Sequence, residues 1–166
     1  AEAGLFIVAD GMGGHRGGEV ASAVAIASMT DGGQAPITLD QLLARVHGAN
    51  AAILERAAGD AALAGMGTTV CAVAALADPG EAEPNRLGIV NVGDSRVYRF
   101  ADDQLVQVTE DHSLVETLLR EGRISADEAR THPHRNILTR ALGIGSDLEV
   151  DYWELPIHLG DRYLLC

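Results

Sequence analysis

The sequence predicts an α+β fold in which antiparallel sheet and helices pack in layers. The first observation is a run of short apolar segments between residues 70 and 108, whose connections are too short to hold crossover helices. The second is a set of signals with Ser or Thr three residues before Glu or Gln, each typical of a helix N-terminus. They are Thr38 with Gln41, Ser113 with Glu116, and Ser125 with Glu128. Helices therefore flank the strand run, which favours α+β over alternating βαβ units.

The chain begins with a strand, a glycine-rich turn and two helices. A short buried strand is expected over residues 5–9, and it ends at Asp10. Five glycines follow within residues 11–18, and they let the backbone adopt positive φ or approach a ligand closely. A helix of small residues is expected from about 19 to 30, and a longer amphipathic helix from 39 to about 58.

The later elements follow from the same alternation of apolar runs and turn signals. They are, in chain order, strands 70–76, 87–92, 96–100 and 105–108, helices 113–122 and 125–132, and strands 148–155 and 163–166. The four strands that precede the helices should form an antiparallel meander because their connections are short. No internal repeat or linker divides the chain, so it should form a single domain.

Composition excludes several classes of function. The formal net charge is −12, so the chain is a poor candidate for binding nucleic acid or an anionic membrane surface. The longest apolar run, residues 70–77, is too short to cross a bilayer. Two cysteines, Cys71 and Cys166, make no disulfide framework, which indicates a reducing compartment and a cytoplasmic location.

The glycine turn after Asp10 does not match the phosphate-binding loops. A dinucleotide-binding loop needs glycine at its first, third and sixth positions, and Arg16 occupies the sixth. A Walker loop needs a lysine, and this chain has none. An acid beside a flexible backbone suits a hard cation bound by carboxylate and carbonyl oxygens. The alternative is a tight turn in which Asp10 caps an amide, and this stretch alone leaves both open.

A second acid turn repeats this arrangement. Residues 92–96 end a strand and place Asp94 beside small residues, which alone is typical of a hairpin. Together with residues 10–15 and 65–69, this turn resembles the metal-dependent Ser/Thr protein phosphatases of the PPM (type 2C) family in their bacterial form. The similarity continues through residues 108–113, 121–124, 132–133, 137–143 and 160–166.

The resemblance implies a fold of four layers, an α-β-β-α sandwich of two antiparallel sheets with a helix pair outside each. It implies that residues 1–166 are the central part of a single phosphatase catalytic domain, because the family's early Asn-Glu-Asp motif, its phosphate-binding arginine and its late acidic motifs have no counterpart here. Residues from about 111 to 136 correspond to the family's mobile flap. The isolated chain is therefore expected to be inactive.

The chemistry that the resemblance implies is hydrolysis of phosphoserine and phosphothreonine by a hydroxide that bridges two Mn²⁺ or Mg²⁺ ions. Asp10 matches the catalytic aspartate that bridges both ions, and Gly11 matches the residue that offers a backbone carbonyl. Asp94 matches a ligand of a third, weaker ion. His15 matches a histidine that lies near the substrate phosphate.

The implied partners are phosphorylated proteins and a Ser/Thr kinase that modifies the same targets in bacterial signalling. The alternative is a non-catalytic phosphatase-like sensor or binding module, and a small-molecule hydrolase is a third possibility. Retention of Asp10 and Asp94 favours the enzyme. Thr68 and Thr69 are interpreted as strand-start residues that support the metal turn, and residues 110–112 as a solvated loop.

Overall fold

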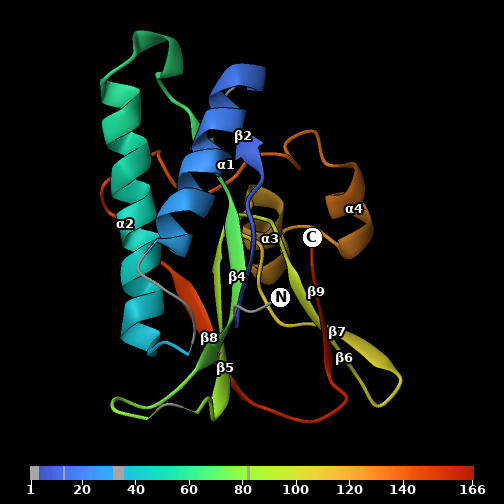
Figure 1. Cartoon of the computed structure of the whole chain (residues 1–166). Coiled ribbons are helices and arrows are strands. Elements are labelled where there is room, and N and C mark those ends of the chain that lie inside the picture. Colours follow the sequence, from blue (N-terminus) through green and yellow to red (C-terminus); the bar gives the residue numbers. More distant parts are fainter. Residues whose placement is uncertain (1–3, 13, 32–35, 82) are drawn as a thin grey trace.

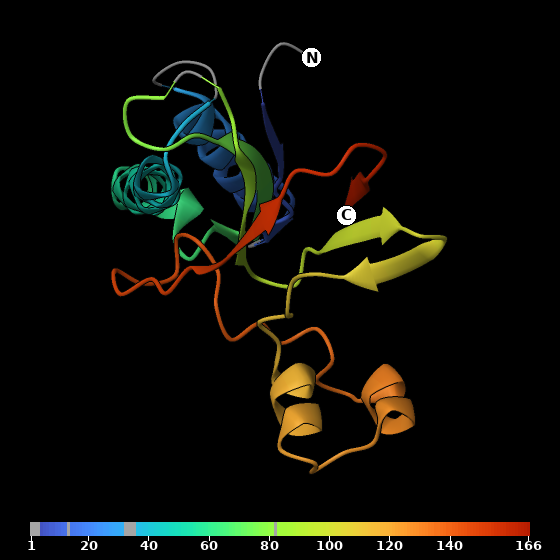
Figure 2. The same ribbon diagram turned by 90° about the horizontal axis from the view of Figure 1, so that it is seen from below.

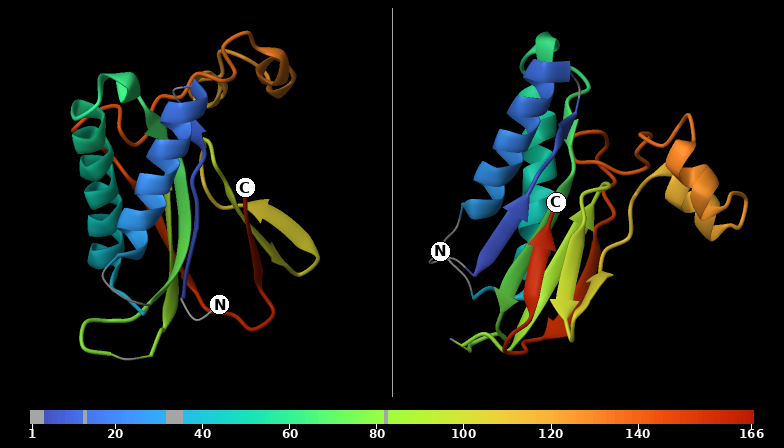
Figure 3. Two further views of the ribbon diagram at one scale, coloured as in Figure 1. Left: turned by 45° about the horizontal axis from the view of Figure 1, so that its top comes forward. Right: turned by 90° about the vertical axis from the view of Figure 1, so that its right-hand side faces the viewer.

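Two helices and two antiparallel sheets form the body of the protein. The computed structural model describes residues 4–12, 14–31, 36–81 and 83–166, and of residues 14–16 the backbone only. Helices α1 (Gly14–Thr30) and α2 (Leu39–Ala58) lie side by side on one face of a four-stranded sheet (Figure 1). A three-stranded sheet lies on the other face (Figure 3). The mixed α+β class with antiparallel sheets is therefore confirmed.

The larger sheet has the order β1-β4-β5-β8, and all neighbouring strands are antiparallel. Its strands are β1 (Leu5–Val8), β4 (Val70–Leu76), β5 (Arg86–Val92) and β8 (Asp151–Pro156). The apolar β4 is buried over almost its whole length, because it has a strand on each side and a layer on each face. Its successive side chains point to opposite faces, so Ala72 packs toward the helices and Val73 toward the second sheet.

Two apolar cores hold these layers together. The first lies between the helix pair and the larger sheet, and its buried members include Ala25, Met29, Val46, Ile53, Ala72 and Val90. The second lies between the two sheets, where buried Cys71, Val73, Ile89 and Val97 pack against partly buried Trp153 and Tyr163. α1 contributes Ala21, Ala25 and Met29 to the first core.

The smaller sheet corrects the expectation of a single meander. It has the order β7-β6-β9, with β6 (Val97–Ala101), β7 (Gln104–Gln107) and β9 (Arg162–Leu165). β4 pairs with β5, and β6 pairs with β7, but the two hairpins belong to different sheets. The chain leaves the larger sheet at Gly93, which has a φ of 110°. Glycine adopts that conformation readily, so the turn that carries Asp94 redirects the chain from one sheet to the other.

Several short elements were not predicted. β2 (Gly11–Met12) and β3 (Gly67–Thr68) form a separate two-stranded ribbon, and η1 (Ala61–Leu63) is a single 3₁₀ turn. α1 begins at Gly14, before the expected residue 19. Among the residues described, no helix is long and apolar enough to span a membrane.

A second pair of helices, α3 (Leu114–Arg120) and α4 (Ala126–Thr131), stands apart from both sheets (Figure 2). The predicted caps form as expected. Thr38 and Ser125 make complete capping boxes, and the Ser113 side chain accepts a hydrogen bond from the Glu116 amide. Neither α3 nor α4 contributes a buried residue. This pair is therefore held to the rest of the protein mainly through the chain at its base.

Candidate active site

Asp10 lies directly after β1, and its backbone is fixed by Thr69. The Asp10 amide donates to Thr69 Oγ1 at 3.0 Å, and the Thr69 amide donates to the Asp10 carbonyl oxygen at 2.9 Å. Within the described residues, the exposed Asp10 carboxylate accepts no hydrogen bond. The alternative of a capping aspartate therefore gains no support there. The geometry agrees with the interpretation of Thr69 as a supporting residue.

Gly11 lies against the helix that follows it. A Cβ atom on Gly11 would stand 2.0 Å from the carbonyl oxygen of Gly18, and one on Gly18 would stand 2.6 Å from the carbonyl oxygen of Gly11. Any larger residue would push β2 away from α1. His15 lies in the first turn of α1, but its side chain is outside the described part of the chain. Its role near the substrate phosphate stays a prediction.

The second acid turn contacts the first through the same threonine. A Cβ atom on Gly93 would stand 2.6 Å from Thr69 Cβ, so the two residues are in close contact. The hydroxyl oxygens of Thr69 and Ser95 lie 2.7 Å apart. Thr69 therefore contacts the backbone of one acid turn and both residues that flank Asp94 in the other.

The negative charge of Asp10 acts on Asp94. The pKa of Asp94 is raised first by partial burial and then by the negative charges of Asp111 and Asp10, while its own backbone amide and Arg96 act in the opposite direction. The structure thus brings together the two acids that the sequence singled out, although 84 positions separate them in the chain. Bringing two carboxylates together costs free energy unless a cation lies between them.

Both carboxylates line one cavity of about 910 Å³. The first wall carries Asp10, Gly11, Met12, Thr69 and Asp94, and the second carries Asn136, Leu138–Ala141, Ile144, Gly145 and residues 147–149. The charged lining residues are four acids and Arg140. Arg140 is itself paired with Glu149 at 2.9 Å and with Asp151 at 2.7 Å. The cavity is therefore negative, which suits a cation at the two aspartates.

The interpretation of residues 110–112 as a solvated loop is wrong for two of the three. His112 is 6% exposed, and Asp111 accepts two hydrogen bonds from Arg96, at 2.8 and 2.6 Å. Glu110 alone is exposed. Burial of such polar groups is tolerated because each has a partner.

A buried asparagine on α2 holds the second wall of the cavity. Asn50 donates from Nδ2 to the Gly145 carbonyl oxygen at 2.9 Å, and its Oδ1 accepts from the Gly143 amide at 2.7 Å. The sequence contained a signal for this residue, because Asn50 follows Ala49 on the apolar face that Val46 and Ile53 define. An asparagine on the buried face of a helix needs hydrogen-bond partners, and here two backbone groups of a loop supply them.

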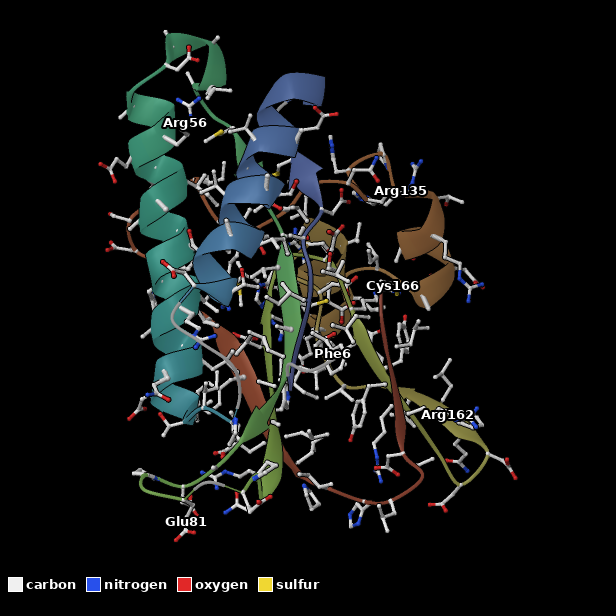
Figure 4. The ribbon with its side chains drawn as sticks, viewed as in Figure 1. Phe6, Arg56, Glu81, Arg135, Arg162 and Cys166 are labelled. Atoms are coloured by element: carbon white, nitrogen blue, oxygen red, sulfur yellow. The ribbon has the colours of Figure 1, made fainter. Side chains whose placement is uncertain are left out.

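The donors in the cavity fit a hard divalent cation, but the described residues supply only part of a coordination sphere. Two carboxylates and the Gly11 carbonyl are oxygen ligands of the kind that Mg²⁺ and Mn²⁺ prefer. Across the described ranges, no three or more His, Cys, Asp or Glu side chains form a group able to hold a metal ion. Figure 4 labels Glu81 at the lower end of the molecule, in the acidic loop between β4 and β5, and this residue does not line the cavity.

Sequence comparison identifies the family of the chain. The family model described as Protein phosphatase 2C matches residues 1–141. The chain is 43% identical over 169 residues to a serine/threonine phosphatase stp from Listeria innocua, with 98% of this chain and 64% of the relative covered. It is 42% identical over 169 residues to the serine/threonine protein phosphatase PstP from Mycobacterium tuberculosis, with 100% of this chain and 31% of the relative covered. The chain thus spans less than two thirds of these curated relatives.

Solved structures show the same fold. The crystal structure of the M. tuberculosis phosphatase PstP/Ppp superposes with a TM-score of 0.85 at 42% identity, covering 99% of this chain and 68% of that one. A catalytic domain of PstP in complex with two manganese ions gives a TM-score of 0.83 at 40% identity, covering 99% of this chain and 67% of that one. From the extent of these matches, the chain belongs to the protein phosphatase 2C family.

Proposed function

We propose that the protein containing this chain is a metal-dependent phosphatase that hydrolyses phosphoserine and phosphothreonine in proteins. The observation that carries the proposal is the convergence of Asp10 and Asp94 on one negative cavity. Within the described residues, neither carboxylate takes part in an ion pair. Two acids without ion-pair partners that line one cavity are expected where a cation binds.

The proposed cofactors are two Mn²⁺ or Mg²⁺ ions, with a third, weaker ion at Asp94. Support comes from the oxygen donors in the cavity and from the two manganese ions of a solved relative. When bound, such ions would supply a water of lowered pKa as the nucleophile and positive charge around the phosphoryl group. Asp10 and the Gly11 carbonyl are the groups of this chain that would hold the first two ions.

The chain's own residues keep these ligands in place. Thr69 fixes the Asp10 backbone through two hydrogen bonds, so the Cα–Cβ bond of Asp10 leaves the end of β1 in one direction. On the other wall, Glu149 and Asp151 hold the Arg140 guanidinium at the cavity. Preorganised ligands of this kind do not need to be ordered when a metal binds.

The finer architecture belongs to the same proposal. We place residues 1–166 in the middle of one catalytic domain with four layers, where α1 and α2 form one outer layer. The segment from 111 to 136 would be the flap, which the isolated position of α3 and α4 supports (Figure 2).

Phosphorylated proteins and a Ser/Thr kinase would be the partners of this phosphatase. Two free cysteines support a cytoplasmic location.

The test is hydrolysis of a phosphothreonine peptide by the purified full-length protein in millimolar Mn²⁺. Activity that disappears with a chelator and returns with Mn²⁺ or Mg²⁺ is expected, and a phosphotyrosine peptide of the same sequence is the matched control. A protein that binds the phosphopeptide without hydrolysing it would instead be a phosphatase-like binding module. The isolated 166 residues, which carry only part of the ligand set, should bind Mn²⁺ weakly and show no turnover.

A further inference from the structure

His112 is a buried histidine that touches both walls of the cavity without lining it. It lies in the loop between β7 and α3, at the base of the proposed flap, and only 6% of it is exposed. A buried imidazole needs partners for both ring nitrogens, so those partners indicate what the residue holds in place.

The first partner is Gly93, the residue before Asp94. The His112 amide donates to the Gly93 carbonyl oxygen at 2.9 Å, and the Gly93 amide donates to His112 Nδ1 at 3.1 Å. Gly93 is also in close contact with Thr69, because a Cβ atom on Gly93 would stand 2.6 Å from Thr69 Cβ. Both a threonine and a histidine therefore contact the residue that precedes Asp94.

The second partner is Asp151 at the beginning of β8. Because Nδ1 accepts a hydrogen bond, the proton of the neutral ring lies on Nε2, which is 3.1 Å from Asp151 Oδ2. Asp151 also accepts from Arg140 at 2.7 Å. Burial acts to raise the pKa of Asp151, but the hydrogen bond from His112 and the hydrogen bond and positive charge of Arg140 act against it, and the pKa is lowered.

The third contact joins His112 to the backbone of the second wall. Its carbonyl oxygen accepts from the Thr139 amide at 2.9 Å, and Thr139 and Arg140 both line the cavity. One residue thus connects the Asp94 turn on the first wall with the Thr139–Arg140 segment on the second.

We propose that His112, in its neutral Nε2–H form, is a positioning residue that sets the backbone of Gly93, the residue before Asp94, and joins it to the opposite wall of the cavity. This inference rests on the proposed phosphatase function, and His112 acts on the site through Gly93 and Asp151. For the site, the hydrogen bond of His112 to Gly93 has a larger effect than its hydrogen bond to Asp151, because only Gly93 is next to an acid that lines the cavity.

Two amide substitutions separate the two bonds. In His112→Asn the side-chain oxygen falls near the place of Nδ1 and can still accept from Gly93. In His112→Gln the amide nitrogen falls near the place of Nε2 and can still donate to Asp151. The full-length wild type, both variants and His112→Ala would be compared by kcat, by KM for a phosphothreonine peptide, by Mn²⁺ affinity and by melting temperature.

We expect His112→Gln and His112→Ala to weaken Mn²⁺ binding at Asp94 and lower kcat by roughly 10- to 100-fold, as for residues that orient metal ligands. His112→Asn should lose only about 2- to 10-fold, which corresponds to one hydrogen bond. KM should change less than kcat. Nitrogen-15 spectra of the wild type should show a protonated Nε2 and an unprotonated Nδ1.

A matched control is Val73→Ala, which destabilises the core between the sheets and should leave the Mn²⁺ affinity unchanged. Equal losses in the asparagine and glutamine variants, in proportion to their melting temperatures, would overturn the proposal, and so would a ring protonated on Nδ1 alone. If the wild type hydrolyses no phosphopeptide, the proposed function fails, whereas the ring tautomer and the Mn²⁺ affinities still decide the role of His112.

Discussion

The hydroxyl oxygens of Thr69 and Ser95 lie 2.7 Å apart, although 26 positions separate the two residues in the chain. Thr69 Oγ1 also accepts a hydrogen bond from the Asp10 amide at 3.0 Å. A single buried hydroxyl therefore connects the two turns that carry Asp10 and Asp94. The relative position of the two acids depends on this threonine as well as on the strands that precede them.

Replacing Thr69 with valine keeps the shape of the side chain and removes its hydroxyl. The Asp10 amide and the Ser95 hydroxyl would then lose a partner, and we expect the free energy of unfolding to fall by about 1–3 kcal/mol. The rate of phosphopeptide hydrolysis should fall as well, because the Asp10 backbone is less restrained. Urea unfolding and steady-state kinetics measure the two effects. Thr69→Ser, which keeps the hydroxyl, is the matched control, and equal behaviour of the two variants would contradict this role.

Asp94→Ala should lower turnover while two tightly bound ions remain. We expect turnover to fall by roughly 10- to 100-fold at limiting metal concentration. Since partial burial, followed by the negative charges of Asp111 and Asp10, raises the pKa of Asp94, the substitution should not lower the melting temperature of the metal-free protein. Metal counting by mass spectrometry under native conditions checks the prediction. Loss of the tight pair would instead assign Asp94 to the two-ion centre.

Cys71 gives the protein a distinct sensitivity to alkaline pH. Burial, followed by the proximity of Cys166, raises the pKa of its thiol to about 12 from an ordinary value of 9.0. Because the pKa is raised in the folded state, the associated stability is fully present below pH 9 and is lost as the pH rises from 9 toward 12.

The free energy of unfolding should therefore fall by up to about 1.4 kcal/mol per pH unit above pH 9 from this thiol alone. Cys71→Ala should remove that part of the slope, whereas Cys166→Ser, at the exposed end of β9, should leave most of it (Figure 4). Urea unfolding at several pH values between 8 and 10.5 measures the slopes. Identical slopes in the wild type and Cys71→Ala would contradict the assignment.

The flap should open at low free energy. Neither α3 nor α4 has a buried residue, whereas β4 is buried almost throughout. Amide hydrogens of residues 114–131 should therefore exchange much faster than those of β4. Native-state hydrogen exchange tests this directly. Equal protection of both segments would mean that the helix pair belongs to the cooperative core, and a gating role would then be untenable.

Local signals predicted the helices and most strands, because those signals act within a few residues. α2 has the expected bounds, since the Thr38 cap and the apolar spacing of Leu42, Val46 and Ile53 agree. β2 and β3 were missed because strands of two residues have no periodicity. The division of the strands between two sheets was also missed, because pairing partners such as β5 and β8 are distant in the chain.

The acids of the site were predicted better than the residues that hold them. Asp10 and Asp94 each follow a strand, so their place at the edge of a sheet could be inferred from sequence. His112 was assigned to solvent because it lies in a polar segment, and its burial results from contacts with Gly93 and Asp151. Arg140 was not singled out for the same reason. Its partners Glu149 and Asp151 lie in a polar segment further along the chain, and nothing in that segment indicates that it pairs with Arg140 at the cavity.

The central claim is that the cavity around Asp10 binds the metal ions on which phosphatase activity depends, and Asp10→Asn in the full-length protein tests it most directly. Asparagine has the same shape but lacks the charge that holds the cations. At millimolar Mn²⁺ we expect kcat for a phosphothreonine peptide to fall by more than about 1,000-fold. Calorimetry should show loss of tight Mn²⁺ binding with an unchanged melting temperature of the metal-free protein. Asp40→Asn, at an exposed position on α2, is the matched control and should behave like the wild type. Near-normal turnover by Asp10→Asn at saturating Mn²⁺, with tight binding retained, would contradict the account.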